Sequence, residues 1–138
     1  MAKKKDIHRK WYLIDVKDKV LGRISSKIAG ILQGKHKPAF STSLDTGDYV
    51  ILINAKDIKL TGEKSENKLY FSHSAYPGSG KTINFAQAQK KDPAFPLIHA
   101  IRGMLPKTAL GRQMIKKLHI YAGSSHPHKA QKPETISI

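Results

Sequence analysis

The sequence predicts an α/β protein, for two reasons. A strand pattern at Trp11–Asp15, a helical pattern and a second strand pattern at Tyr49–Ile53 follow one another, which is the order of a right-handed βαβ unit with parallel strands. The second strand is also continuously apolar, as in a sheet covered on both faces. We therefore expect a three-layer sandwich with a small, mostly parallel sheet of about four strands.

The first elements have clear boundaries. Trp11–Asp15 is a short apolar run that ends at a carboxylate, which fits a buried strand and its exit. Apolar residues then recur with a helical period from Leu21 to Leu32, and Gly34 marks the end of this helix. Arg23 lies on its flank.

The middle of the chain predicts shorter strands. Ile58–Leu60 is compatible with a brief strand, and Lys68–Ser72 predicts a second one with Leu69 and Phe71 facing inward. Pro77–Lys81, rich in glycine and containing proline and serine, predicts a loop.

The second half of the chain predicts helices and a closing strand. Helical patterns cover Asn84–Lys91, with Asn84 as a candidate cap, and Pro96–Met104. After a proline break, Leu110 and Met114 continue at helical spacing, and Leu118–Tyr121 alternates as a strand does. Four basic residues occupy the positions between the apolar ones and predict one cationic flank: Lys107, Arg112, Lys116 and Lys117.

Three regions follow from this pattern. Residues 1–10 have too few apolar side chains to offset the entropy of ordering and predict a basic, flexible arm. Residues 11–123 predict a single α/β domain, and residues 124–138 an irregular tail.

The charge distribution indicates an anionic partner. The net charge is +15, from 25 lysines and arginines against 10 acids. Residues 1–10 hold five basic side chains and one acid, and residues 101–138 hold seven and one. A basic arm and a basic C-terminal region around a more balanced middle are typical of a nucleic-acid-binding protein.

Several chemistries are disfavoured. The chain has no cysteine, which excludes disulfides and thiolate chemistry. Gly80-Lys81-Thr82 resembles the end of a phosphate-binding loop, but Ala75 stands where that motif needs glycine. Asp45 and Asp48 are read as turn formers rather than an acid/base pair. His126-Pro127-His128 lacks a third metal ligand nearby, so neither a metal nor another cofactor is predicted.

These motifs share an order that resembles the bacterial-type large-subunit ribosomal protein family numbered thirteen. The resemblance covers nearly the whole chain from Trp11 onward, and its motifs are specific only in combination. It is carried by Trp11–Asp15, Leu21-Gly22-Arg23, Gly34–Lys37, Asp45–Tyr49, Thr61-Gly62, Gly103–Lys107, Leu110-Gly111-Arg112, Leu118, Ile120, Tyr121, Gly123 and His126–Gln131.

The resemblance implies a structural constituent of the large ribosomal subunit, without enzymatic activity, that binds and stabilises folded large-subunit RNA during assembly. It implies ribosomal RNA and neighbouring ribosomal proteins as partners, and no membrane or small-molecule substrate. The expected location is the cytoplasm, and an organellar ribosome is also compatible with the sequence. The residues expected to bind RNA are Lys3, Lys4, Lys5, Arg9, Lys10, Arg23, Lys35, His36, Lys37, Lys107, Arg112, Lys116, Lys117, His126, His128 and Lys129.

Two other classes of function remain open on the residues alone. A nucleotide-dependent enzyme on a doubly wound fold would need a glycine-rich turn after Asp15, and Val16–Lys19 contains no glycine. A DNA-binding or regulatory protein would carry a similar charge, and a competition between duplex DNA and structured RNA would separate it from a ribosomal protein.

Overall fold

The computed structural model describes residues 7–138, so Lys3, Lys4 and Lys5 of the expected arm lie outside the described residues. The elements in chain order are β1 Trp11–Asp15, α1 Leu21–Gln33, β2 Tyr49–Ile53, η2 Ala55–Asp57, α2 Lys64–Asn67, β3 Leu69–Ser72, β4 Lys81–Asn84, α3 Phe85–Lys91, α4 Phe95–Met104, α5 Ala109–Ile115, β5 Leu118–Ile120, η3 His128–Gln131 and β6 Glu134–Thr135.

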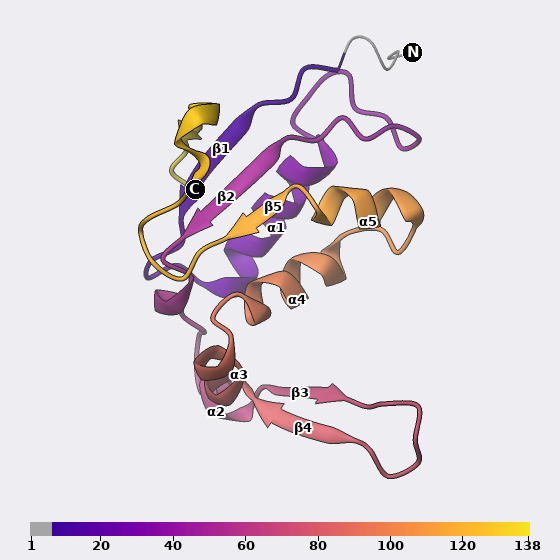
Figure 1. The fold of residues 1–138 in the computed structure, drawn as a ribbon, viewed down its shortest axis with the longest axis vertical. Helices are drawn as coiled ribbons and strands as arrows, with labels where there is room; N and C mark the ends of the chain where they lie inside the picture. Colours follow the sequence, from indigo (N-terminus) through magenta and orange to yellow (C-terminus); the bar gives the residue numbers. More distant parts are fainter. Residues whose placement is uncertain (1–6) are drawn as a thin grey trace.

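The main sheet has four parallel strands in the order β5-β2-β1-β6 (Figure 1). β1 and β2 pair along their whole length, from Trp11 opposite Tyr49 to Asp15 opposite Ile53, and α1 lies between them in the chain. The predicted α/β class, βαβ unit and four-stranded parallel sheet are therefore confirmed.

Helices cover one face of this sheet. Ile14, Val50 and Leu52 point to that face and join α1 and α4 in one apolar core. α1 ends where the sequence predicts, because Gly34 adopts a left-handed φ of 82° and its N–H returns to the carbonyls of Gly30 and Ile31.

The opposite face carries aromatic side chains and is covered by the tail. Trp11 and Tyr49 stack with ring centroids 4.3 Å apart, and His119 continues the row on β5. His128 of the tail packs on this row, 5.3 Å from Trp11 and 4.6 Å from His119 between centroids. The third layer is thus the C-terminal tail.

The tail is more regular than expected. It forms the η3 turn and then β6, which pairs in parallel with the free edge of β1. Short polar segments such as Glu134–Thr135 carry too little pattern for a strand to be predicted, and here the open edge of β1 supplies the hydrogen-bonding partners.

Strands β3 and β4 form a separate antiparallel hairpin that projects away from the main sheet (Figure 1). The prediction that Leu69 and Phe71 face inward is wrong, because Tyr70 is the buried residue and its two neighbours are exposed. A shift of one residue exchanges the two faces of a strand, and the sequence alone does not fix that phase. β4 was not predicted, and Ile58–Leu60 contributes only an isolated bridge between Lys59 and Val20.

Candidate nucleic-acid interface

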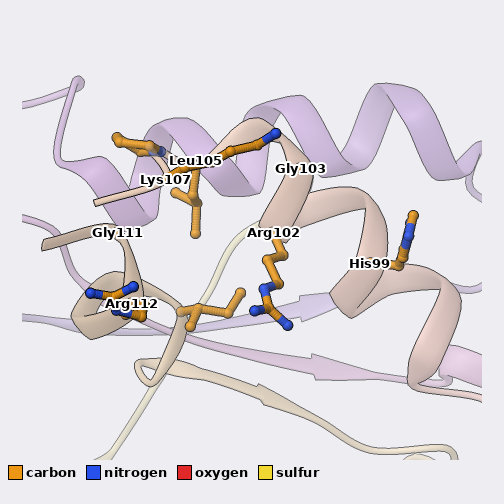
Figure 2. A pocket seen from close by; sticks show the side chains of 9 residues that line it. His99, Arg102, Gly103, Leu105, Lys107, Gly111 and Arg112 are labelled. Carbon is orange, nitrogen blue, oxygen red and sulfur yellow. The ribbon is translucent and has the colours of Figure 1, made fainter. Parts of the chain in front are cut away.

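A groove of about 550 Å³ lies between α4, the segment 105–108 and α5. Its lining residues, which include four that are basic or contain imidazole and none that is acidic, are His99, Arg102, Gly103, Leu105, Pro106, Lys107, Gly111, Arg112 and Ile115. We call this feature the cationic groove. Figure 2 shows His99 at one end and Lys107, Gly111 and Arg112 at the other.

The sequence builds this groove by breaking one helix and starting the next. α4 ends at Met104, and Pro106 cannot continue it. Thr108 then caps α5, because its hydroxyl oxygen accepts a hydrogen bond from the Gly111 N–H at 3.3 Å. Leu105 and Met114 are buried and anchor the two sides to the core.

Gly111 permits a close approach between the groove walls. A Cβ placed on Gly111 would lie 1.8 Å from the carbonyl oxygen of Pro106. No side chain fits there without a movement of the backbone, so the closeness of α5 to the preceding segment depends on glycine.

Two of the predicted residues, Lys107 and Arg112, line the cationic groove. Arg102, Lys107 and Arg112 are exposed, and Lys116 is exposed directly after α5. Like charges gathered at a concave surface raise its positive potential and favour an anionic ligand. Arg102 was not among the predicted site residues. The sequence did place it on a predicted helix, Pro96–Met104, and its charge was the only signal that could have identified it.

Lys117 does not share this exposed surface, and the prediction that it does is wrong. Its side chain is 5% exposed, and its ammonium donates to the carbonyl oxygen of Leu32 at 3.0 Å and to the carboxylate of Asp45. Burial lowers the pKa of Lys117, and the neighbouring Asp45 opposes that shift. Lys117 therefore ties β5 to the end of α1.

Asp48 organises a second set of predicted residues. Its buried carboxylate accepts hydrogen bonds from the Lys37 ammonium at 2.6 Å and the Lys10 N–H at 2.8 Å, and it pairs with His36 Nε2 at 2.9 Å. The Lys37 ammonium also donates to the carbonyls of His8 and Thr46. We call these contacts the Asp48 network. They engage the ammonium of the half-buried Lys37 within the protein, whereas Lys35 is exposed.

The described part of the arm is held by the same region. Arg9 lies 3.6 Å from Asp45, the Lys10 N–H binds Asp48, and the carbonyl of Lys10 accepts the Tyr49 N–H. Residues 8–10 thus belong to the folded body. The Lys10 ammonium pairs with Glu134 at 3.2 Å, and hydrogen bonding to that carboxylate raises the pKa of Lys10.

The other predicted residues lie elsewhere. His128 shares a hydrogen bond of 2.6 Å with the Tyr121 hydroxyl and packs on the sheet, and His126 is half-buried beside it. Lys129 is exposed on η3. Arg23 is exposed on α1, in a small hollow of about 250 Å³ with Lys19 and Lys27, away from the cationic groove.

The rival sites have no counterpart in the described residues. Gly80, Lys81 and Thr82 lie at the end of a hairpin loop and the start of β4, not at a strand-to-helix turn. Within residues 7–138, no three His, Asp or Glu side chains are grouped to hold a metal ion, and no helix is long and apolar enough to cross a membrane.

An α/β body with a cationic groove that has no acidic lining residue is typical of a nucleic-acid-binding protein. Residues 9–127 match the family model described as ribosomal protein L13. The chain belongs to the ribosomal protein L13 family.

Curated relatives match along nearly their whole length. The large ribosomal subunit protein uL13 of Dictyoglomus thermophilum is 54% identical over 100% of this chain and 97% of its own. The uL13 proteins of Petrotoga mobilis and of Geobacter sp. strain M21 are 53% and 51% identical, over 99% and 100% of this chain and 91% and 97% of theirs. The predicted family is confirmed, and with it the expectation of a ribosomal protein that is not an enzyme.

Proposed function

We propose that the chain binds folded large-subunit ribosomal RNA through the cationic groove and holds that RNA in its assembled shape. The observation that carries this proposal is the gathering of Arg102, Lys107 and Arg112 around a groove without a single acidic lining residue. Lys116, exposed after α5, extends the same surface.

The groove is suited to phosphates held in a fixed arrangement. Lysine and arginine side chains on phosphates release condensed counterions, which supplies affinity without sequence selectivity. Because α4 and α5 are anchored through buried Leu105 and Met114, the cations keep their spacing, and that spacing favours RNA folded to match it. Two RNA segments bound to one rigid body are held close despite their mutual repulsion.

The remaining parts of the proposal follow from the positions of the other cations. Arg23, Lys35 and Lys129 are exposed away from the groove and form secondary RNA contacts. Lys3, Lys4 and Lys5 add charge from the arm. Lys37, Lys117 and His128 act indirectly, because their polar groups are engaged within the protein. The partners are ribosomal RNA and adjacent proteins of a cytoplasmic large subunit.

The test compares matched charge reversals in the full chain. The probe is protein-free bacterial large-subunit RNA, and the measurement is filter binding between about 50 and 200 mM salt. Arg112→Glu with Lys116→Glu should reduce the slope of log affinity against log salt by about two. Lys17→Glu with Lys56→Glu makes the same change in net charge at exposed positions outside the groove lining and should have a much smaller effect.

Stability measurements separate binding from folding. The groove variant should melt within a few degrees of the parent, since both side chains are exposed. Met114→Asp should instead unfold the protein first, because Met114 is buried in the core. Equal RNA affinity of the parent and the groove variant would refute the proposed interface. Equal competition by duplex DNA would favour the DNA-binding alternative.

A further inference from the structure

Residues 124–132 of the tail lie over one face of the main sheet, and we call them the histidine cover. The segment has no large apolar side chain and contains two histidines, His126 and His128. His128 packs on Trp11 and His119, and His126 lies nearly parallel to His128 with ring centroids 6.5 Å apart. Imidazoles therefore make the ring contacts that hold the cover on the sheet.

The two ends of the cover are anchored independently of these rings. Before it, the carbonyl of Gly123 accepts a hydrogen bond from the Asn54 N–H at 2.9 Å. After it, β6 pairs with β1, and Ile136 donates its N–H to the Leu13 carbonyl and packs against the core. Lys132, the last residue of the cover, has a left-handed φ of 47°, which is unfavourable for a residue with a side chain. The cover can therefore lift between its anchors without unpairing the sheet.

His119 and His128 are close enough to oppose two positive charges, because their ring centroids are 4.6 Å apart. Burial, with a smaller contribution from His128, lowers the pKa of His119. One imidazolium is tolerated, since the face of Trp11 attracts a cation and His128 keeps its hydrogen bond to the Tyr121 hydroxyl in either charge state. A second proton places two like charges side by side in a partly buried site.

The surrounding groups do not offset that second charge. The nearby titratable rings are neutral at this pH or are themselves bases: Tyr121 and His126 contact His128, and Tyr49 stacks on Trp11. Within residues 7–138, no carboxylate forms an ion pair with either imidazole. The charged groups on the adjoining elements are engaged elsewhere or exposed: Lys10 with Glu134, Lys117 with Asp45, Asp15 with Asn54, and Lys129 and Lys132 in solvent.

We propose that the histidine cover is a pH-sensitive device, which lies on the sheet at neutral pH and lifts when His119 and His128 are both protonated. Lifting exposes the stacked rings of Trp11 and Tyr49 and relieves the left-handed backbone at Lys132. The body stays folded, because the apolar core with α1 and α4 lies on the opposite face of the sheet. The inference does not involve RNA and can fail separately from the proposed function.

The chain contains one tryptophan, so the fluorescence of Trp11 reports the position of the cover. The measurement is acrylamide quenching of the full chain between about pH 7.5 and 5.0, a range in which carboxylates with ordinary pKa values stay largely ionised. As the pH falls, the quenching constant of the parent should rise by about two-fold or more. The far-ultraviolet circular dichroism of the body should not change.

The variant His119→Phe tests the charge pair. It keeps a ring against Trp11 and leaves one titratable imidazole in the pair. Its quenching constant should equal that of the parent at neutral pH and change by less than about 1.2-fold on acidification. His73→Phe is the matched control, because it makes the same substitution at an exposed histidine between β3 and β4, and it should respond to pH like the parent.

Hydrogen exchange of the parent gives a second measurement that needs no variant. After correction for the intrinsic pH dependence, exchange should accelerate on acidification in residues 124–132 and stay slow in Trp11–Asp15. Three results would overturn the proposal: parent quenching that does not change with pH, acid opening of His119→Phe like that of the parent, or opening accompanied by loss of circular dichroism or by equal acceleration in Trp11–Asp15. The last result would mean that acid unfolds the whole domain.

Discussion

Replacing Asp48 with asparagine separates its role as a turn former from its role as the buried carboxylate of the Asp48 network. Asparagine forms turns as readily as aspartate, so Asp48→Asn leaves the local turn preference intact. It removes the negative charge from a buried position that bonds to Lys10, His36 and Lys37. Any loss of stability therefore measures the Asp48 network and not the turn.

The expected loss is large for a conservative change. Breaking a buried ion pair from one side costs about 3–5 kcal/mol. The Lys37 side chain retains 21% exposure and can regain some water, so we expect about 2–4 kcal/mol here. With an unfolding entropy of about 2.1 cal/mol/K per residue, a chain of 138 residues loses about 3.5 °C per kcal/mol. The melting temperature should fall by about 7–14 °C.

The assay is thermal unfolding followed by circular dichroism at neutral pH, with Glu66→Gln on α2 as a control for loss of an exposed carboxylate. The control should melt within about 2 °C of the parent. If Asp48→Asn also melts within that range, the network does not stabilise the fold, and Asp48 serves only as the turn former that the sequence indicates.

Further variants probe the groove wall and the tail. Gly111→Ala should destabilise the protein by about 1–3 kcal/mol in urea unfolding, because its Cβ would overlap the Pro106 carbonyl. The control Gly30→Ala in α1, where a Cβ meets open space, should stabilise the protein by up to about 1 kcal/mol. Equal effects of the two substitutions would contradict the close approach at Gly111. Burial, with a smaller contribution from His128, lowers the pKa of His119, so a nuclear magnetic resonance titration should place that pKa below 6.5, and His128→Phe should raise it. The folded state then binds fewer protons than the unfolded state, so stability should fall as the pH drops below 6.5 toward the lowered pKa; a His119 pKa at or above 6.5 would contradict this account.

Local patterns predicted most of the secondary structure. The helix ending at Gly34, the buried strand Tyr49–Ile53 and the cap at Asn84 each depend on residues close in the chain, and each is present. The cationic flank was predicted in part, because Lys107 and Arg112 do line one groove. Each of these features is determined by residues that are close together in the sequence.

The misassigned residues depend on distant partners. Lys117 follows another lysine in the sequence, and its burial is evident only from its bonds to Leu32 and Asp45, which lie 85 and 72 positions earlier. Lys37 likewise looks like a phosphate ligand until Asp48 is placed beside it. Phe71 was predicted to face inward from its place in the strand Lys68–Ser72, whereas the contact of Tyr70 with α4 decides which face of β3 is buried. No pattern in a single sequence reports such tertiary contacts.

The position of β6 has a consequence for how the chain is made. β1 leaves a translating ribosome well before its outer neighbour β6, because Glu134 of β6 lies 124 positions after Lys10. At about 5–20 residues per second, the edge of β1 stays open for about 6–25 seconds. During that interval the nascent chain offers an unpaired strand to its neighbours, the kind of edge that promotes aggregation. A product that lacks β6 would keep that edge open, so the sheet closes only after β6 has been made.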